Sequence, residues 1–499
     1  MRSTSVSLCQ IVRNEAHQLA DCLAPVAALF DEVVVVDTGS SDGTQDVARR
    51  FTPHVHTFPW CDDFAAARNA SLAQARGEWI FWLDADDRLT PDNVGRLRML
   101  LDRLGTQPQI YLMDTTCSLT YASEGSRVIS HARLFRRHPD LRWQGRVHEQ
   151  LRPAPATLGY ESVWSDVQID HVGYQDAALR QRKLQRDIRL LRIDYAVDPD
   201  DVSTLLHLGL SYARLGNNAA ARQHLERLLA AGLGDASHMR QVYGALAELS
   251  HSESKFQDVL QITKRGLLQF PDDEHLLYLQ AEALYELDQY PAARVALARL
   301  LACPAQRQYR GGGLGEIRTR LAPRLLSNVL RMEGDLDQAE ATLREVIQKS
   351  KSDTVSWYML GWVYIDAHRR PQLDEVVAAL QSCPQGNIFS GLLLAAWHLQ
   401  HRELDAAGLL IEQLVGLAPL MPLPRLLRLE WLHLSGAPVE AQIQACRDAL
   451  RIQPSNPTTA QTLANLENAM QRPAATPAAS DFCTSVVLGA GVPNGIAPA

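Results

Sequence analysis

Residues 33–44 read VVVVDTGSSDGT, four valines followed by an aspartate and a loop of small residues. Four consecutive β-branched residues favour a buried strand, and the Gly, Ser and Asp residues behind them favour a turn. Asp37 is therefore expected at the carboxyl end of a strand, where open α/β sheets bind their ligands. The small residues also let a ligand approach the backbone. Taken alone, the stretch is explained equally well as an Asp-Gly turn with a helix cap.

A second run of large apolar residues ends in a group of acids, WIFWLDADD at residues 79–87. Asp84, Asp86 and Asp87 fall within four positions, and such carboxylates repel one another unless a cation lies between them. Mg²⁺ or Mn²⁺ held by one or two carboxylates and a substrate diphosphate fits this pattern. The alternative is an acid-rich helix N-terminus, with Thr90 and Pro91 starting the helix.

Short apolar runs alternate with helical patterns up to about residue 175. Strands are expected at 6–12, 32–36 and 79–83, and helices at 17–29, 43–51 and 64–75. Strands separated by helices indicate βαβ units and a mostly parallel sheet covered on both faces. Residues 131–171 follow no regular period, and their Arg, His and Trp content predicts irregular loops at the rim of a site.

Beyond residue 178 strand signals nearly vanish, and a small or apolar position recurs. The spacings along this series are 38, 34, 46, 34, 34 and 34 residues, and its members are Ala221, Val259, Ala293, Ala339, Leu373, Ala407 and Ala441. A 34-residue period is typical of tetratricopeptide repeats, in which small residues let paired helices pack closely. The longest step includes residues 309–315, which we expect to form a flexible loop. Chance periodicity in an Ala- and Leu-rich region is the alternative.

These patterns divide the chain into four parts. An α/β domain is expected at residues 1–177, a linker helix at 178–200, about seven helical repeats at 201–471 and a disordered tail at 472–499. In the linker helix, Arg182, Arg186 and Arg189 share one face. This face is either solvated or a contact for a diphosphate or an anionic membrane.

The composition limits the class of protein. A net charge of −8 over 499 residues argues against a nucleic-acid coat or a polybasic membrane anchor. The eight cysteines are scattered singly, without a CxxC pair, which favours a reducing compartment. The sequence shows neither an apolar signal-peptide core at its start nor an apolar run of the roughly 20 residues that a spanning helix needs. We therefore expect a cytoplasmic protein without a transmembrane segment.

Four motifs, in order, resemble glycosyltransferase family 2, whose catalytic domain has the GT-A fold. They are SLCQIVRNE (7–15), VVVVDTGSSDGT (33–44), FAAARNASLAQARGEWI (64–80) and LDADD (83–87). The resemblance covers residues 5–175, about a third of the chain. It implies transfer with inversion from a nucleoside-diphosphate sugar, with Mg²⁺ or Mn²⁺ as cofactor. Since UDP is the common carrier in the family, a UDP-sugar is the expected donor.

The resemblance also implies roles for individual residues. It makes Asp86 the direct metal ligand, and Asp84 a contact to the ribose and the metal. Some relatives recruit a late histidine to the metal, which makes His171 in IDHVGY a further ligand, although an isolated histidine is more often structural. The residues expected around the nucleotide are Asp37, Thr38, Gly39, Ser40, Asp42, Arg68 and Asn69.

An inverting transferase needs a base that deprotonates the acceptor. Many family members carry an acidic pair at this stage of the chain, whereas LRWQGRVHEQL (141–151) has His148 and Glu149. We expect Glu149 to be the base, with His148 as its neighbour or as a contact to the metal or diphosphate. His131 and Arg133 resemble a rim segment that orients donor or acceptor.

The resembled subgroup joins such a domain to tetratricopeptide repeats and acts on varied acceptors, including lipopolysaccharide cores and peptide side chains. The repeats would hold a peptide, protein or glycan acceptor, drive homodimerisation, or serve as a structural annex. One alternative function is an interaction scaffold with a vestigial transferase domain. Another is a nucleotidyltransferase, but its chemistry needs a Gly-rich loop after the first strand, and IVRNEAHQL has no glycine.

Overall fold

The computed structural model describes residues 4–118, 126–173, 177–232, 234–303, 313–314, 316–454 and 456–470. The expected tail at 472–499 lies outside these residues. The chain forms two compact units, Met1–Ala283 with Ala302–Glu316, and Leu284–Leu301 with Ile317–Ala499. The first unit joins the α/β domain to the first repeat helices, so the domain boundary expected at residue 177 stays a prediction.

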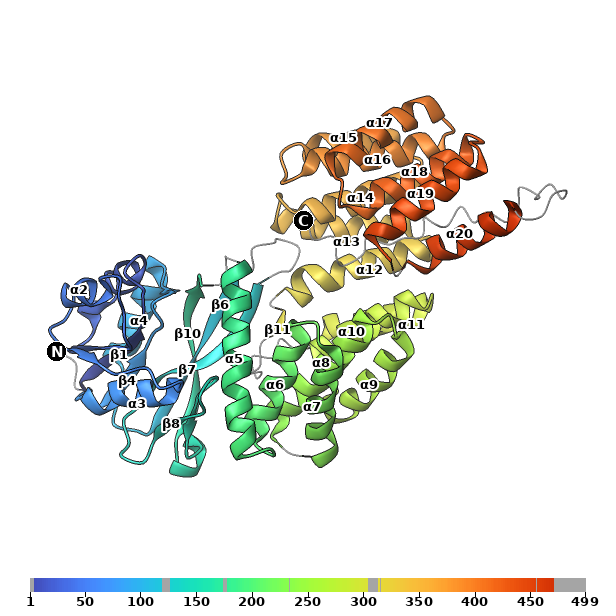
Figure 1. Cartoon of the computed structure of the whole chain (residues 1–499). Coiled ribbons are helices and arrows are strands. Elements are labelled where there is room, and N and C mark those ends of the chain that lie inside the picture. The colour runs from blue at the N-terminus through green and yellow to red at the C-terminus, as the bar shows by residue number, and fades with distance from the viewer. Residues whose placement is uncertain are drawn as a thin grey trace. The chain divides into compact units, whose positions relative to one another are not determined.

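A nine-stranded sheet forms the centre of the first unit, in the order β3-β2-β1-β4-β7-β6-β10-β5, with β11 paired to β7. The first four strands are parallel, β7 is antiparallel to β4 and β6, and β10 is parallel to β6 (Figure 1). The strands are β1 (Val6–Val12), β2 (Glu32–Asp37), β3 (Val55–Thr57), β4 (Trp79–Trp82), β5 (Asp87–Arg88), β6 (Gln109–Ser118), β7 (Ser126–Arg136), β10 (Glu161–His171) and β11 (Gly313–Leu314). The α/β class expected from the sequence is confirmed.

Alternating side chains of the central strands enter two cores, one on each face of the sheet. Leu8 and Phe81 pack with α1 (Leu19–Leu23) and α4 (Pro91–Asp102) on one face. Cys9 and Trp82 pack on the other face with α3 (Phe64–Gln74) and the small hairpin of β8 (Arg142–Gln144) and β9 (Gln150–Arg152). Because both faces of β1 and β4 are covered, their sequences are mostly apolar, and the polar Ser7 and Gln10 of β1 are buried as well.

The strand register brings three loops to one edge of the sheet. Val12 at the end of β1 pairs with Asp37 at the end of β2, and Cys9 pairs with Trp82 at the end of β4. The loop from Asp37 to α2 (Thr44–Arg49) and the acidic stretch after β4 therefore leave the sheet at the same carboxyl edge. Ligands of open α/β sheets bind at this edge.

The expectation of irregular loops over 131–171 is wrong. Strands β7 and β10 begin and end this segment, and with the hairpin of β8 and β9 between them they cover just over half of it. The strand pattern was hidden because polar residues occupy covered positions: Arg133 is 1% exposed and is paired with a carboxylate. Most of the loop expected at 309–315 lies outside the described residues, but Gly313 and Leu314 are not in a loop, because they pair with β7 as β11.

Helices follow the sheet domain along the rest of the chain. The first unit holds α5 (Ala177–Val197), α6 (Val202–Arg214), α7 (Asn218–Ala231), α8 (Ala236–Ser252), α9 (Phe256–Gln269) and most of α10 (Glu274–Glu286). The second holds most of α11 (Tyr290–Ala302), then α12 (Ala322–Met332), α13 (Leu336–Lys349), α14 (Thr354–Asp366), α15 (Arg370–Leu380), α16 (Gly386–Gln400), α17 (Leu404–Leu417), α18 (Pro422–Leu434), α19 (Val439–Ile452) and α20 (Pro457–Met470). The helical repeats expected from the sequence are confirmed. No helix among the described residues combines the length and the apolar character needed to cross a membrane.

The recurring small position is buried in six repeats and displaced by one residue in the seventh. The buried members, each the fourth residue of its helix and fully covered, are Ala221, Val259, Ala293, Ala339, Leu373 and Ala407. The prediction of Ala441 is wrong, because the fourth residue of α19 is the buried Gln442. The turn from Gly436 to Pro438 holds one residue more than its counterparts, which shifts the start of α19.

Candidate active site

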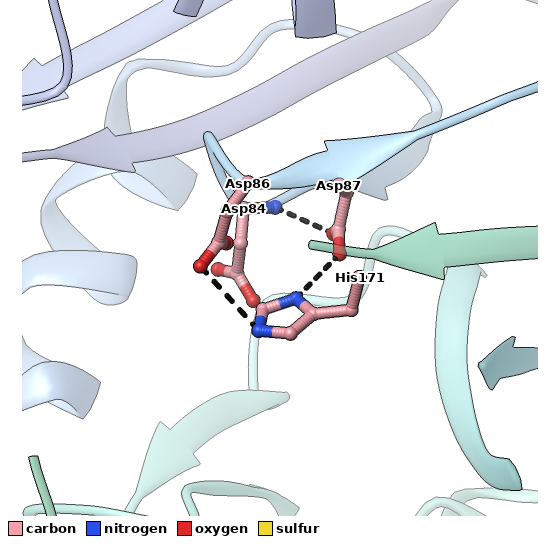
Figure 2. A group of neighbouring side chains, drawn as sticks. All are labelled: Asp84, Asp86, Asp87 and His171. Atoms are coloured by element: carbon pink, nitrogen blue, oxygen red, sulfur yellow. Dashed lines mark hydrogen bonds and ion pairs between the residues drawn. The ribbon is translucent and has the colours of Figure 1, made fainter. Parts of the chain in front are cut away.

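Three aspartates and a histidine form a compact cluster at the carboxyl edge of the sheet. Ligand atoms of Asp84, Asp86, Asp87 and His171 all lie within 4.8 Å of one another. Figure 2 shows the three carboxylates around the imidazole ring. The pairing of β5 with β10 explains the arrangement, because Asp87 is the register partner of His171.

Asp87 orients its neighbours and is itself fully buried. Its Oδ2 accepts hydrogen bonds from Arg133 Nη1 at 2.7 Å and from the backbone N of Asp84 at 2.8 Å. Its Oδ1 lies 3.0 Å from Nδ1 of His171 (Figure 2). With Nδ1 held in this way, Nε2 of His171 lies 3.4 Å from Asp86 Oδ2. A carboxylate behind a histidine is the usual arrangement for fixing the orientation of a metal-binding imidazole.

The pKa values of Asp84 and Asp86 are shifted in opposite directions. Burial by itself would raise the pKa of Asp84, but the charges of Arg68, Arg133 and His171 outweigh it and hold that pKa well below its ordinary value. The pKa of Asp86 is raised, first by burial and then by the charges of Asp84 and Asp87, against the opposing charges of His171 and Lys183. Burial and the neighbouring carboxylates therefore make the ionised form of Asp86 unfavourable.

This donor set fits a divalent cation. Asp84 and Asp86 offer carboxylate oxygens, His171 offers one imidazole nitrogen, and Asp87 is already used by its hydrogen bonds. Hard divalent ions such as Mg²⁺ and Mn²⁺ take one or two carboxylates and leave positions for substrate phosphates. A cation here would offset the repulsion between Asp86 and the neighbouring carboxylates. Burial alone would lower the pKa of His171, but its hydrogen bond to Asp87 and the nearby carboxylates raise it.

Arg68 on α3 links this cluster to Glu149. Its Nη2 donates to Asp84 Oδ1 at 2.9 Å, its Nε donates to Glu149, and its side chain is only 8% exposed. The guanidinium lies 4.2 Å from the ring centroid of Trp82, and that of Arg133 lies 3.9 Å from the same ring. Arg68 thus holds Asp84 and Glu149 together in one buried network.

Two other residues expected at the site have different surroundings. The side-chain amide of Asn69 donates to Trp143 O at 2.8 Å and accepts from Trp143 N at 2.9 Å, which fastens β8 to α3. His148 stacks on His207 of α6, with ring centroids 4.0 Å apart. His148 therefore faces the first repeat, whereas Glu149 stays with Arg68.

The loop after β2 surrounds Asp37, which is fully buried. Its Oδ2 accepts hydrogen bonds from the backbone N of Gly39 and Ser40 and from Nε2 of Gln45. Gly39 has a φ of 105°, a conformation that favours glycine. Within the described residues, Asp37 Oδ1 is buried without a hydrogen-bond partner. This oxygen keeps its capacity to accept a hydrogen bond.

The other polar residues of this loop shape it. Thr38 Oγ1 donates to Val12 O, and Ser40 Oγ accepts from the backbone N of Asn14. Asp42 accepts hydrogen bonds from the backbone N of Ala16 and of Thr44. Its contacts are therefore those of a turn and helix cap, the alternative considered for residues 33–44. These bonds join the loops that follow β1 and β2 into one wall.

Comparison with known proteins identifies the family. The sequence model described as Glycosyl transferase family 2 matches residues 7–141, and that of a tetratricopeptide repeat matches residues 203–231. A TPR repeat-containing protein of Synechococcus elongatus is 32% identical over 310 residues, which cover 59% of this chain and 75% of that protein. The chain belongs to the family 2 glycosyltransferases that carry tetratricopeptide repeats.

Two further likenesses cover less of this chain. The SPbeta prophage-derived glycosyltransferase SunS of Bacillus subtilis is 27% identical over 222 residues, so the aligned part spans 44% of this chain and about half, 51%, of SunS. Glucosyl-3-phosphoglycerate synthase from Mycobacterium tuberculosis, solved with Mn²⁺ and UDP-glucose, is 23% identical over 23% of this chain and 44% of its own, with a TM-score of 0.20. So low a score carries no weight for function.

Sequence reasoning about the family 2 domain missed two residues at the cluster. A Cβ on Gly173 would lie 1.9 Å from Asp86 Oδ2, so any larger residue would displace this carboxylate. Lys183 on α5 places its Nζ 3.5 Å from the same oxygen. The spacing of Gly173 from His171 in IDHVGY is a signal that could have found the first. Lys183 had no signal, because only tertiary packing brings α5 to the cluster.

Proposed function

We propose that the chain transfers a sugar, with inversion, from a nucleoside-diphosphate sugar to an acceptor, and that the donor is a UDP-sugar. The observation that carries this proposal is the buried network in which Arg68 joins Asp84 of the acidic cluster to Glu149. The acidic cluster in this network could bind a metal ion and a diphosphate, and the carboxylate of Glu149 could take a proton from an acceptor. Asp37 offers a buried oxygen at the same edge of the sheet.

Asp84, Asp86 and His171 would hold Mg²⁺ or Mn²⁺ at this edge. The cation would supply the charge that stabilises the departing diphosphate. Asp87 and Arg133 would keep His171 and Asp84 in position through their hydrogen bonds. Metal dependence is thus part of the proposal, supported by the ligand atoms of the cluster, which lie within 4.8 Å of one another.

The nucleotide would lie on the loop after β2. Asp37 Oδ1 would accept a hydrogen bond from the base or ribose, with Thr38, Gly39, Ser40 and Asp42 forming the loop around it. Asp84 would lie near the ribose. Asn69 would not contact the nucleotide, because both ends of its amide are hydrogen-bonded to Trp143. Arg68 would orient Asp84 and Glu149.

Glu149 is the proposed base. Its side chain is 12% exposed, and its contact with Arg68 fixes its direction relative to the cluster. A base positioned in this way removes the proton of the acceptor as the new bond to the sugar forms. His148 would take no part in the proton transfer, because its ring stacks on His207.

The repeats are proposed to hold the acceptor, a peptide or protein side chain. In support, the first repeat contacts the segment that carries Glu149: His207 stacks on His148, and Ser203 accepts a hydrogen bond from Gln150. Tetratricopeptide surfaces suit extended peptides. Alternatively, the repeats would bind a glycan acceptor or form a homodimer. A cytoplasmic location is retained, since the described cysteines are all free thiols.

Thermal unfolding with a nucleotide panel tests the proposal. UDP, GDP, ADP, CDP and dTDP are each added with and without Mn²⁺, and a ligand at 100 times its dissociation constant should stabilise the fold by about 2.7 kcal/mol. We expect one diphosphate to raise the midpoint in the presence of Mn²⁺, and Asp86→Ala to abolish the rise. A well-folded chain that responds to none of them would favour the alternative, a tetratricopeptide scaffold with a vestigial transferase domain.

A further inference from the structure

Lys183 extends from the first helix after the sheet domain to the acidic cluster. Its Nζ lies 3.5 Å from Asp86 Oδ2 and 3.4 Å from the carbonyl oxygen of Gly173, and its side chain is 28% exposed. A lysine is a compact point charge on a flexible stem, which suits both carboxylates and phosphates. The ammonium group therefore lies at the part of the site where a diphosphate would meet the metal ligands.

Packing holds α5 in this place. Leu190, two helical turns beyond Lys183 and on the same face, is fully buried in a core that includes Leu191 and Val147. Arg189 pairs with Asp62 through two bonds of 2.7 Å. The position of Lys183 against the cluster is thus a consequence of how the helix docks on the sheet domain.

A charge count shows why a further cation is needed. Asp84 and Asp86 together offset the two charges of a divalent ion, so the charge of a bound diphosphate needs another partner. Arg68 is shared between Asp84 and Glu149, and Arg133 is bonded to Asp87. Of these cations, Lys183 makes the longest contact with a carboxylate of the cluster, 3.5 Å, and its side chain is 28% exposed, so it can meet a ligand that enters from solvent.

We infer that Lys183 binds the β-phosphate of the donor, an inference that rests on the proposed function. In the unliganded chain its ammonium group offsets Asp86. When a divalent cation binds the carboxylate of Asp86, the ammonium group of Lys183 would leave this carboxylate and bind the β-phosphate instead. The helix that joins the transferase domain to the repeats thereby becomes part of the donor site.

Calorimetric titration of the full-length chain with UDP and with UMP, both in Mn²⁺, tests this role. GDP with GMP, and dTDP with dTMP, serve as further pairs. Lys183→Met removes the charge and keeps most of the stem, and Lys183→Arg restores a cation. Arg182→Met is the matched control, an exposed cation one residue away on α5. We expect Lys183→Met to weaken the diphosphate at least tenfold and the monophosphate hardly at all, with Lys183→Arg and Arg182→Met close to wild type.

Two results would overturn the inference. Lys183→Met could bind the diphosphate as tightly as wild type does, or it could lose diphosphate and monophosphate equally, which would indicate support of the pocket rather than a phosphate contact. A wild-type chain that binds no nucleoside diphosphate is a different failure, that of the proposed function itself, and the inference falls with it. The thermal midpoint of each variant without ligand shows whether a loss of binding reflects a loss of folding.

Discussion

His148 stacks on His207 with ring centroids 4.0 Å apart and planes inclined by 10°. The first belongs to the sheet domain and precedes the proposed base, and the second lies on α6, the first helix of the repeats. Val147 continues the contact by packing against Leu190 and Leu208. The first repeat thus packs against the sheet domain at the segment that carries Glu149.

This histidine stack should make the fold sensitive to acid. Burial, followed by the charges of Arg214 and Arg186, lowers the pKa of His148 to about 4, and burial lowers that of His207 well below its ordinary value. In the unfolded chain histidines titrate with a pKa of about 6.5. Between these values the unfolded chain binds more protons, so stability should fall as the pH drops from about 6.5 towards 4.

Denaturant unfolding of His148→Asn at pH 7 and pH 4.5 checks this expectation. Asn tolerates the φ of 54° at this position and does not titrate. The variant should lose less stability on acidification than wild type, by roughly 1–3 kcal/mol. His17→Asn, at an exposed position, is the control and should follow wild type. An unchanged pH dependence in His148→Asn would place the acid sensitivity elsewhere.

Replacing Asp84 and Asp86 one at a time by the neutral asparagine should change the stability of the fold in opposite directions. Because the pKa of Asp86 is raised, its ionised form is unfavourable in the unliganded fold, and Asp86→Asn should raise the thermal midpoint while abolishing Mn²⁺ binding. Asp84→Asn removes a partner of Arg68 and should destabilise by about 1–3 kcal/mol, less than for a fully buried pair because the side chain is 32% exposed. Two shifts of the same sign would contradict this account of the cluster.

Gly173→Ala should disable the metal site without unfolding the chain. The added Cβ would lie 1.9 Å from Asp86 Oδ2, so the carboxylate must move away from His171. We expect Mn²⁺ affinity, measured by calorimetry, to fall at least tenfold. Gly95→Ala, where a Cβ meets nothing within 4 Å inside α4, is the control and should stabilise the helix by about 0.5–1 kcal/mol. Wild-type Mn²⁺ affinity in Gly173→Ala would remove Asp86 as a ligand.

The parts of the site that are local in sequence could be predicted, because strand ends have clear patterns. The valine run before Asp37 and the apolar run before Asp84 fix which residues leave the sheet at its carboxyl edge. The parts that depend on tertiary contacts could not. Nothing in the linker helix distinguishes Lys183 from the arginines around it, and nothing next to Glu149 indicates that His148 faces α6.

Paired charges explain why β7 was missed. Arg133 has the polarity of a surface residue, but it is buried because Asp87 and Thr115 take its hydrogen bonds. A hydrophobicity pattern cannot show such pairing, since the partners lie 46 and 18 positions away. The shift from Ala441 to Gln442 has a different cause, one additional residue in a turn, which periodicity alone does not reveal.

Glu149→Gln should separate the proposed base from the donor site. The amide oxygen can still accept the hydrogen bond from Arg68, so the buried network and nucleotide binding should be retained. The group that takes the acceptor proton is lost, and the rate should fall about 10²–10⁴-fold, with loss of the acidic limb of the pH–rate profile. The rate is measured as release of UDP from a UDP-sugar that binds, beside UDP affinity by calorimetry. Full activity would remove Glu149 as the base, whereas a parallel loss of UDP affinity would show that its pairing with Arg68 shapes the pocket instead.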